Sequence, residues 1–171
     1  MSERRILGID PGSRYTGYGV IASDGRHSRH AGSGRICTAD RPWPERLGPI
    51  FEGVRQVMRQ YRPQEVAVEQ VFLARNPASA LKLGQARGAA ICAVLASGVR
   101  VFEYAPRAVK QALVGGGGAD KAQVQHMVRV ILALDGELAE DQSDALAVAI
   151  CHAHTQALPR GRAATWRDYR P

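Results

Sequence analysis

Cysteine is scarce in this chain and its three residues are far apart. Cys37, Cys92 and Cys151 form no Cys-X-X-Cys pair. An odd number at this spacing indicates neither a disulfide framework nor a zinc site, and it favours a reduced, cytosolic setting. We expect Cys92 and Cys151, which lie in apolar helical stretches, to be small core residues. The five histidines show no ligand spacing either, so the sequence does not indicate a metal site built on nitrogen or sulfur.

Long hydrophobic runs are absent as well. The longest apolar stretch, residues 89–96, is too short to span a bilayer, and the first residues lead into only a short apolar run. We therefore expect no signal peptide and no membrane association. At 171 residues, 45% hydrophobic and 23% charged, the chain is typical of one globular domain. The sequence predicts this domain over residues 1–157 and a basic, disordered tail over residues 158–171.

Acidic residues are outnumbered by basic ones. The chain has 23 Lys and Arg against 16 Asp and Glu, a net charge of +7. Such a balance favours a polyanionic partner, either nucleic acid or an acidic membrane surface. The alternative is charge that serves solubility alone.

Hydrophobic periodicity predicts an α/β fold with a mixed sheet. Two strands and a weaker third form a β-meander, after which helices and strands alternate. The predicted strands cover residues 4–10, 15–22, 29–38, 65–69 and 99–104. The predicted helices cover residues 45–61, 76–97, 106–113, 119–134 and 141–157.

Four acidic residues lie at the ends of apolar segments. Asp10 and Glu69 end predicted strands, while Asp141 and Asp144 share one face at the start of an apolar helix. Each has an ordinary explanation. An Asp-Pro-Gly turn suits Asp10, a strand-end charge suits Glu69, and helix N-terminal acids favour the macrodipole. The Asp10 segment also fits the phosphate-binding hairpin of actin-like kinases.

Together, however, these carboxylates predict a metal site. Neighbouring strands could bring Glu69 beside Asp10, and the apolar helix should pack its acidic start onto the same sheet. Clustered carboxylates repel unless a cation neutralises them, and Mg²⁺ prefers oxygen ligands. Two Mg²⁺ ions roughly 4 Å apart would support in-line hydrolysis of a phosphodiester by an activated water. A basic protein with such a site is expected to act on nucleic acid.

Further residues are candidates for DNA contact. Lys110 and Lys121 flank a glycine-rich loop at residues 115–118, which lacks the Walker A spacing. The lysines could bind phosphates or simply be solvated. Phe72 follows Glu69 in a loop, where it could stack on a base or anchor the loop in the core.

Taken together, these residues resemble the RuvC family of Holliday-junction resolvases. The resemblance spans about residues 4–157 and is specific in its order and spacing. It rests on LGIDPG (7–12), TGYG (16–19), VEQVF (68–72), ALKLGQARG (80–88), ADKAQV (119–124) and DQSDALA (141–147).

The resemblance implies an RNase H-like fold, with a mixed five-stranded β-sheet flanked by α-helices. It also implies a homodimer that nicks four-way DNA junctions in paired, symmetric fashion during recombination and repair, with Mg²⁺ (or Mn²⁺) as cofactor. RuvA–RuvB would be the partner complex. The family's metal-site acids fall on Asp10, Glu69, Asp141 and Asp144. Its DNA-contacting positions fall on Phe72, Lys110 and Lys121, and we add Arg75 and Lys82 to the expected DNA contacts.

The apolar helix over residues 78–97 has more apolar surface than one sheet face needs, so we expect part of it to form the dimer interface.

Two alternative functions compete with this interpretation. One is a different RNase H-like nuclease acting on RNA or an RNA–DNA hybrid, and the other is an actin-like kinase. The kinase class needs a second lobe and a longer chain. A non-enzymatic DNA-binding protein would not need four converging acids.

Overall fold

A computed structural model describes residues 3–70 and 76–157 of the chain. Its sheet has five strands in the order β3-β2-β1-β4-β5. The strands are β1 (Arg4–Asp10), β2 (Tyr15–Ser23), β3 (Ser28–Cys37), β4 (Glu65–Glu69) and β5 (Val101–Tyr104). The helices are α1 (Leu47–Tyr61), α2 (Pro77–Leu95), α3 (Pro106–Val114), α4 (Lys121–Leu132) and α5 (Glu140–Ala157).

The sheet is mixed, as predicted. The meander β1-β2-β3 is antiparallel, whereas β4 pairs in parallel with β1 and β5 pairs in parallel with β4. Parallel neighbours need crossover connections, which α1 and α2 supply. The carboxyl ends of β1, β4 and β5 therefore lie at one edge of the sheet.

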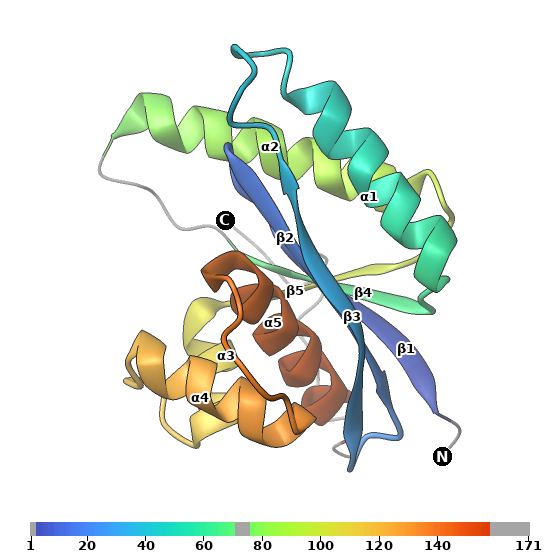
Figure 1. The fold of residues 1–171 in the computed structure, drawn as a ribbon, viewed down its shortest axis with the longest axis vertical. Helices are drawn as coiled ribbons and strands as arrows, with labels where there is room; N and C mark the ends of the chain where they lie inside the picture. The colour runs from blue at the N-terminus through green and yellow to red at the C-terminus, as the bar shows by residue number, and fades with distance from the viewer. Residues whose placement is uncertain (1–2, 71–75, 158–171) are drawn as a thin grey trace, which may run out of the picture.

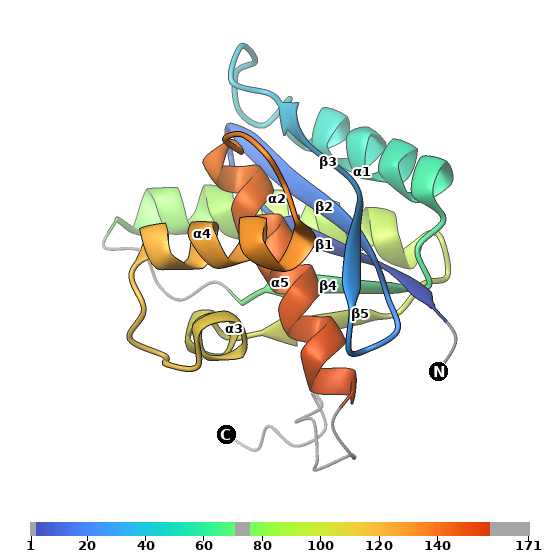
Figure 2. The same ribbon diagram turned by 60° about the horizontal axis from the view of Figure 1, so that its bottom comes forward.

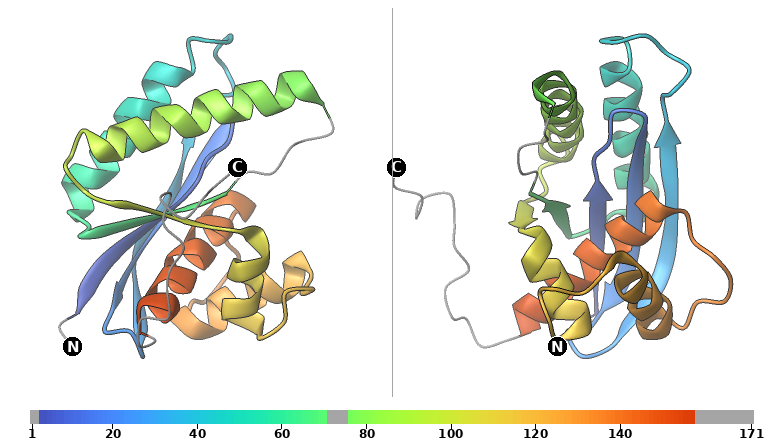
Figure 3. Two further views of the ribbon diagram at one scale, coloured as in Figure 1. Left: turned by 180° about the vertical axis from the view of Figure 1, so that it is seen from behind. Right: turned by 90° about the vertical axis from the view of Figure 1, so that its left-hand side faces the viewer.

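Helices cover both faces of the sheet. Helices α1 and α2 lie on one side, and α3, α4 and α5 lie on the other (Figures 1 and 3). Because side chains alternate along a strand, Leu7 and Ile9 pack in the core under α1 and α2, while Ile6 packs in the core with α5. Strands buried on both faces explain the continuous apolar runs in the sequence.

Helix α5 lies unusually close to the sheet, which it crosses in Figure 2. A Cβ atom on Gly8 would come within 1.9 Å of the Ala145 carbonyl oxygen, and one on Gly17 within 2.0 Å of the Asp141 carbonyl oxygen. Only glycine tolerates this approach of two backbones. The acidic start of α5 is thereby fixed against β2.

The element predictions are confirmed with shifted ends. Helix α4 is shorter than the predicted 119–134, because Asp120 caps its start in a capping box and Ala133 adopts a left-handed conformation at its end. The prediction for Cys92 was wrong. Cys151 is buried, but Cys92 is exposed, because it lies on the side of α2 turned away from the sheet.

Some predictions lie outside the described residues. These are the loop residues Phe72 and Arg75 and the tail over 158–171. Among the described residues, no helix is both long and apolar enough to cross a membrane.

Candidate active site

Asp10 and Glu69 end two neighbouring parallel strands. Ile9 of β1 is in register with Val68 of β4, so the next residues, the two acids, are also neighbours. Their side chains share the sheet face of Gly8 and Ala67, which is the face covered by α5. The predicted juxtaposition of these two acids is confirmed.

Asp141 and Asp144 reach the same place from α5. Both lie in its first two turns, and the Asp141 backbone is held against Gly17, which pairs with Asp10 across β1 and β2. The charges of Asp144 and Asp141 both act on Asp10. The four predicted acids therefore converge at one edge of the sheet.

Burial and mutual repulsion raise the pKa of three of these acids. Burial, followed by the charges of Asp144 and Glu69, raises the pKa of Asp10 to about 7. Burial and the charge of Asp144 raise the pKa of Glu69 as well. The pKa of Asp144 is raised by burial, although its hydrogen bond from Lys121 opposes this. Such an arrangement is costly without a further cation.

Two of the predicted lysines lie at this edge and one does not. The Lys121 ammonium donates to Asp144 Oδ2 at 3.0 Å and also pairs with Glu140. The charge of Lys110 lowers the pKa of Glu69 against the effect of burial. Lys82 is exposed on α2, which covers the opposite face of the sheet, and contacts none of these acids through a described hydrogen bond or ion pair.

The donor set fits a hard divalent cation. It consists of carboxylate oxygens, and the buried Asp141 Oδ2 has no hydrogen-bond partner among the described residues. In the part of the chain that the structure describes, no three acidic, histidine or cysteine side chains are close enough to share one ion. Lys121 Nζ lies 3.0 Å from Asp144 Oδ2, so a metal ion held by Asp144 would have to displace this contact.

Comparison with known proteins identifies the family to which this chain belongs. Residues 6–152 match the family model described as crossover junction endodeoxyribonuclease RuvC. The chain belongs to the RuvC family.

Curated RuvC family members are similar over most of the chain. The crossover junction endodeoxyribonuclease RuvC of Marinobacter nauticus is 58% identical over 149 residues, which are 87% of this chain and 85% of that protein. The protein of the same name from Vibrio vulnificus is 57% identical over 150 residues, 88% of this chain and 87% of that protein.

Two solved structures have folds similar to that of this chain. T. thermophilus RuvC in complex with a Holliday junction substrate has a TM-score of 0.85 at 39% identity, over 90% of this chain and 95% of that one. The yeast mitochondrial Holliday junction resolvase Ydc2 has a TM-score of 0.63 at 12% identity, over 90% of this chain and 81% of that one, and so shares the fold. The RNase H-like prediction is confirmed.

Residues that sequence analysis missed support this RuvC-family site. Arg87 of α2 donates through Nε to the Glu69 carbonyl oxygen at 3.4 Å and pairs with Glu103 of β5, which ties the end of β4 to its neighbours. Thr16, fully buried, donates to the Gly12 carbonyl oxygen at 3.3 Å and closes the turn after Asp10. No sequence spacing pointed to these contacts. Gly8 in the first strand, with Gly17 and Gly19 in the second, could have indicated the close approach of α5.

Proposed function

We propose that this chain is a Holliday-junction resolvase that acts in homologous recombination and DNA repair by paired, symmetric nicks in a four-way DNA junction. The convergence of Asp10, Glu69, Asp141 and Asp144 at one sheet edge, in a RuvC-family chain, carries this proposal. The solved T. thermophilus relative was bound to a Holliday junction. A net charge of +7 suits a DNA substrate.

The four acids would hold two Mg²⁺ ions, and Mn²⁺ could substitute. When bound, the ions supply charge compensation and water activation for phosphodiester hydrolysis. The chain itself keeps the carboxylates close together, holds Asp10 half-buried at the end of β1 and fixes the first turn of α5 through Gly17. Lys121, released from Asp144, would remain paired with Glu140 beside the scissile phosphate.

Four-way junctions have two-fold symmetry, so we propose a C₂ homodimer with one active site per subunit. Helix α2 offers a surface for it. Leu81 and Leu95 on its outer side are 70% and 56% exposed, and between them Gly84 and Gly88 have open space where side chains would project. We propose that this surface is part of the dimer interface.

We propose residues 1–157 as the nuclease domain. The family resemblance supports Phe72 as a residue that stacks on DNA bases and Lys110 and Lys121 as DNA-backbone contacts, and we add the basic residues Arg75 and Lys82 to these contacts. Cooperation with RuvA–RuvB and a cytoplasmic location complete the proposal.

The test is cleavage of a labelled four-way DNA junction beside matched duplex and RNA–DNA hybrid, with and without Mg²⁺. We expect paired symmetric nicks in the junction only, with metal only. Asp10→Asn should abolish cleavage but keep junction binding, since removing a negative charge does not weaken attraction to DNA. Cutting of the hybrid instead would overturn the substrate while leaving the metal site in place.

A further inference from the structure

A polar row on α4 leads away from the proposed active site. Lys121, Gln125 and Arg129 recur every four residues and so lie along one side of the helix. Lys121 contacts Asp144, and Arg129 lies about 12 Å further along the helix axis. The row therefore extends from the catalytic edge along the neighbouring surface.

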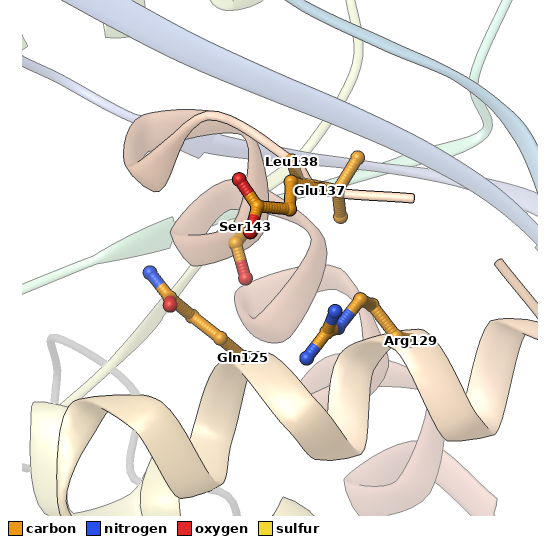
Figure 4. A pocket seen from close by; sticks show the side chains of 5 residues that line it. All are labelled: Gln125, Arg129, Glu137, Leu138 and Ser143. Atoms are coloured by element: carbon orange, nitrogen blue, oxygen red, sulfur yellow. The ribbon is translucent and has the colours of Figure 1, made fainter. Parts of the chain in front are cut away.

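The far part of this row lines a cavity of about 200 Å³. Gln125 and Arg129 of α4 form one wall, Glu137 and Leu138 of the α4–α5 connection form another, and Ser143 of α5 lies opposite α4 (Figure 4). Four of these five residues are polar or charged. A small polar group suits such a lining better than an apolar one.

Ser143 gives the second indication of a ligand. Its side chain is 1% exposed, and its hydroxyl has no hydrogen-bond partner among the residues that the structure describes. Figure 4 shows this hydroxyl pointing between the side chains of Gln125 and Arg129. A buried hydroxyl without a partner is unfavourable, so an acceptor in the cavity would stabilise it.

The charges facing the cavity favour a phosphate held by Arg129. The guanidinium of Arg129 matches phosphate oxygens in a bidentate fashion, and Gln125 and Ser143 add neutral donors. Glu137 opposes an anion, but it is exposed on the connection before α5 and can turn into solvent. Asp141 and Glu140 lie toward the Lys121 end of the row, where Lys121 pairs with Glu140.

We propose that this cavity binds one backbone phosphate of the DNA strand that passes the active site, with Arg129, Gln125 and Ser143 as its donors. The inference rests on the proposed function, because Lys121 of the same α4 row contacts Asp144 and so places α4 beside the position where the strand would be cut. The contact would fix the register of the strand relative to the four acids. Ser143, two residues after Asp141, would thereby link strand position to the start of α5.

The test measures metal-free junction binding over a series of salt concentrations. Arg129→Ala should weaken binding and reduce the slope of log affinity against log salt by about 0.9, the value for one lost phosphate contact. Ser143→Ala should weaken binding about 10-fold, as for a hydrogen bond to a charged group, with the slope unchanged. Glu137→Gln should tighten it. Arg59→Ala removes the same charge from α1, on the other side of the sheet, and should leave binding nearly unchanged.

Single methylphosphonate substitutions along the strand then identify the phosphate. At one position near the cut, the neutral linkage should weaken wild-type binding but have no further effect on Arg129→Ala. A wild-type protein that cuts the junction, with Arg129→Ala and Ser143→Ala binding as tightly as wild type, would refute the cavity and leave the resolvase proposal standing. Failure of the wild type to bind any junction would refute the resolvase proposal itself.

Discussion

The two ends of β4 carry glutamates in opposite environments. Glu65 starts the strand, and its carboxylate accepts hydrogen bonds from Arg4 at 2.9 and 3.1 Å and contacts His152 Nε2 at 3.0 Å. Glu69 ends the strand four residues later on the same face. No described residue donates a hydrogen bond to the Glu69 carboxylate, and its pKa is raised by burial and by Asp144.

The difference shows where the chain supplies its own counter-charge and where it does not. At the Glu65 end, Tyr104 completes the network, with its hydroxyl 2.6 Å from His152 Nδ1. A neutral His152 protonated on Nε2 satisfies both contacts. At the Glu69 end, the described cations whose charges act on the clustered carboxylates are Lys121 and Lys110. Unbalanced buried charge at one edge of an otherwise balanced core is the signature of a ligand site.

The largest expected effect is on junction cleavage, which should distinguish a variant of Glu69 from a variant of Glu65. Glu69→Gln should abolish junction cleavage, because it removes a proposed metal ligand, while folding is retained. Glu65→Gln, the same substitution at the other end of the strand, should cleave at close to the wild-type rate per folded molecule. Rates on a labelled junction in excess Mg²⁺ give the comparison. Equal loss in both variants would mean that the two ends do not differ in role.

The second effect is on stability and has a defined pH window. Because the pKa of Asp10 is raised from 3.8 to about 7, folded metal-free protein holds a proton there that the unfolded chain releases. Stability should therefore fall as pH rises from about 4 to 7. Asp10→Asn should remove this loss and stabilise the metal-free protein by up to about 4 kcal/mol at pH 8, but not at pH 4.

Urea unfolding in chelator at both pH values measures this difference. Mg²⁺ at pH 8 should stabilise the wild type and have less effect on Asp10→Asn, since a ligand stabilises the state that binds it. An Asp10→Asn variant less stable than wild type at pH 8 would show that the Asp10 carboxylate is already compensated.

The third effect is on the stability that Glu65 contributes at the start of β4. Glu65→Gln should destabilise the fold by about 2 kcal/mol, because it breaks charge-assisted hydrogen bonds to Arg4 and His152 in a largely buried setting. Glu52→Gln on α1 is the matched control, since Glu52 is exposed and pairs with Arg55 at 3.5 Å. It should change stability by less than about 0.5 kcal/mol. Equal unfolding midpoints for the two variants would mean that the Glu65 contacts stabilise the fold no more than the exposed Glu52–Arg55 pair does.

The smallest effect concerns His152. Burial lowers the pKa of His152 below its ordinary 6.5, although Glu65 acts in the other direction. The unfolded chain then binds more protons than the folded one below pH 6.5, so this group should cost stability as pH falls, opposite in sign to Asp10. NMR titration of the His152 ring should give a pKa below the ordinary value of 6.5. A higher value would mean that the ring is charged in the fold.

Sequence reasoning predicted much of this molecule because the signals are local. Apolar runs located the five strands, and the cap signals at Asn76-Pro77 and Asp120 explain where α2 and α4 begin. The prediction for Cys92 failed because an apolar helix with two apolar sides does not reveal which side faces the sheet. The Glu65–His152 pair joins residues 87 positions apart, and no spacing rule indicates such a contact.

The sequence by itself determined the oxygen-rich donor set, the basic charge and the order of the elements, since these depend on residue type and short-range periodicity. Only the tertiary structure decided that Asp10 and Glu69 are neighbours on the α5 face, that Gly8 and Gly17 admit α5, and that the Ser143 hydroxyl beside Arg129 has no hydrogen-bond partner among the described residues. These features arise from strand register and the close packing of a helix on a sheet. Both depend on contacts between residues far apart in the chain, which local preferences do not encode.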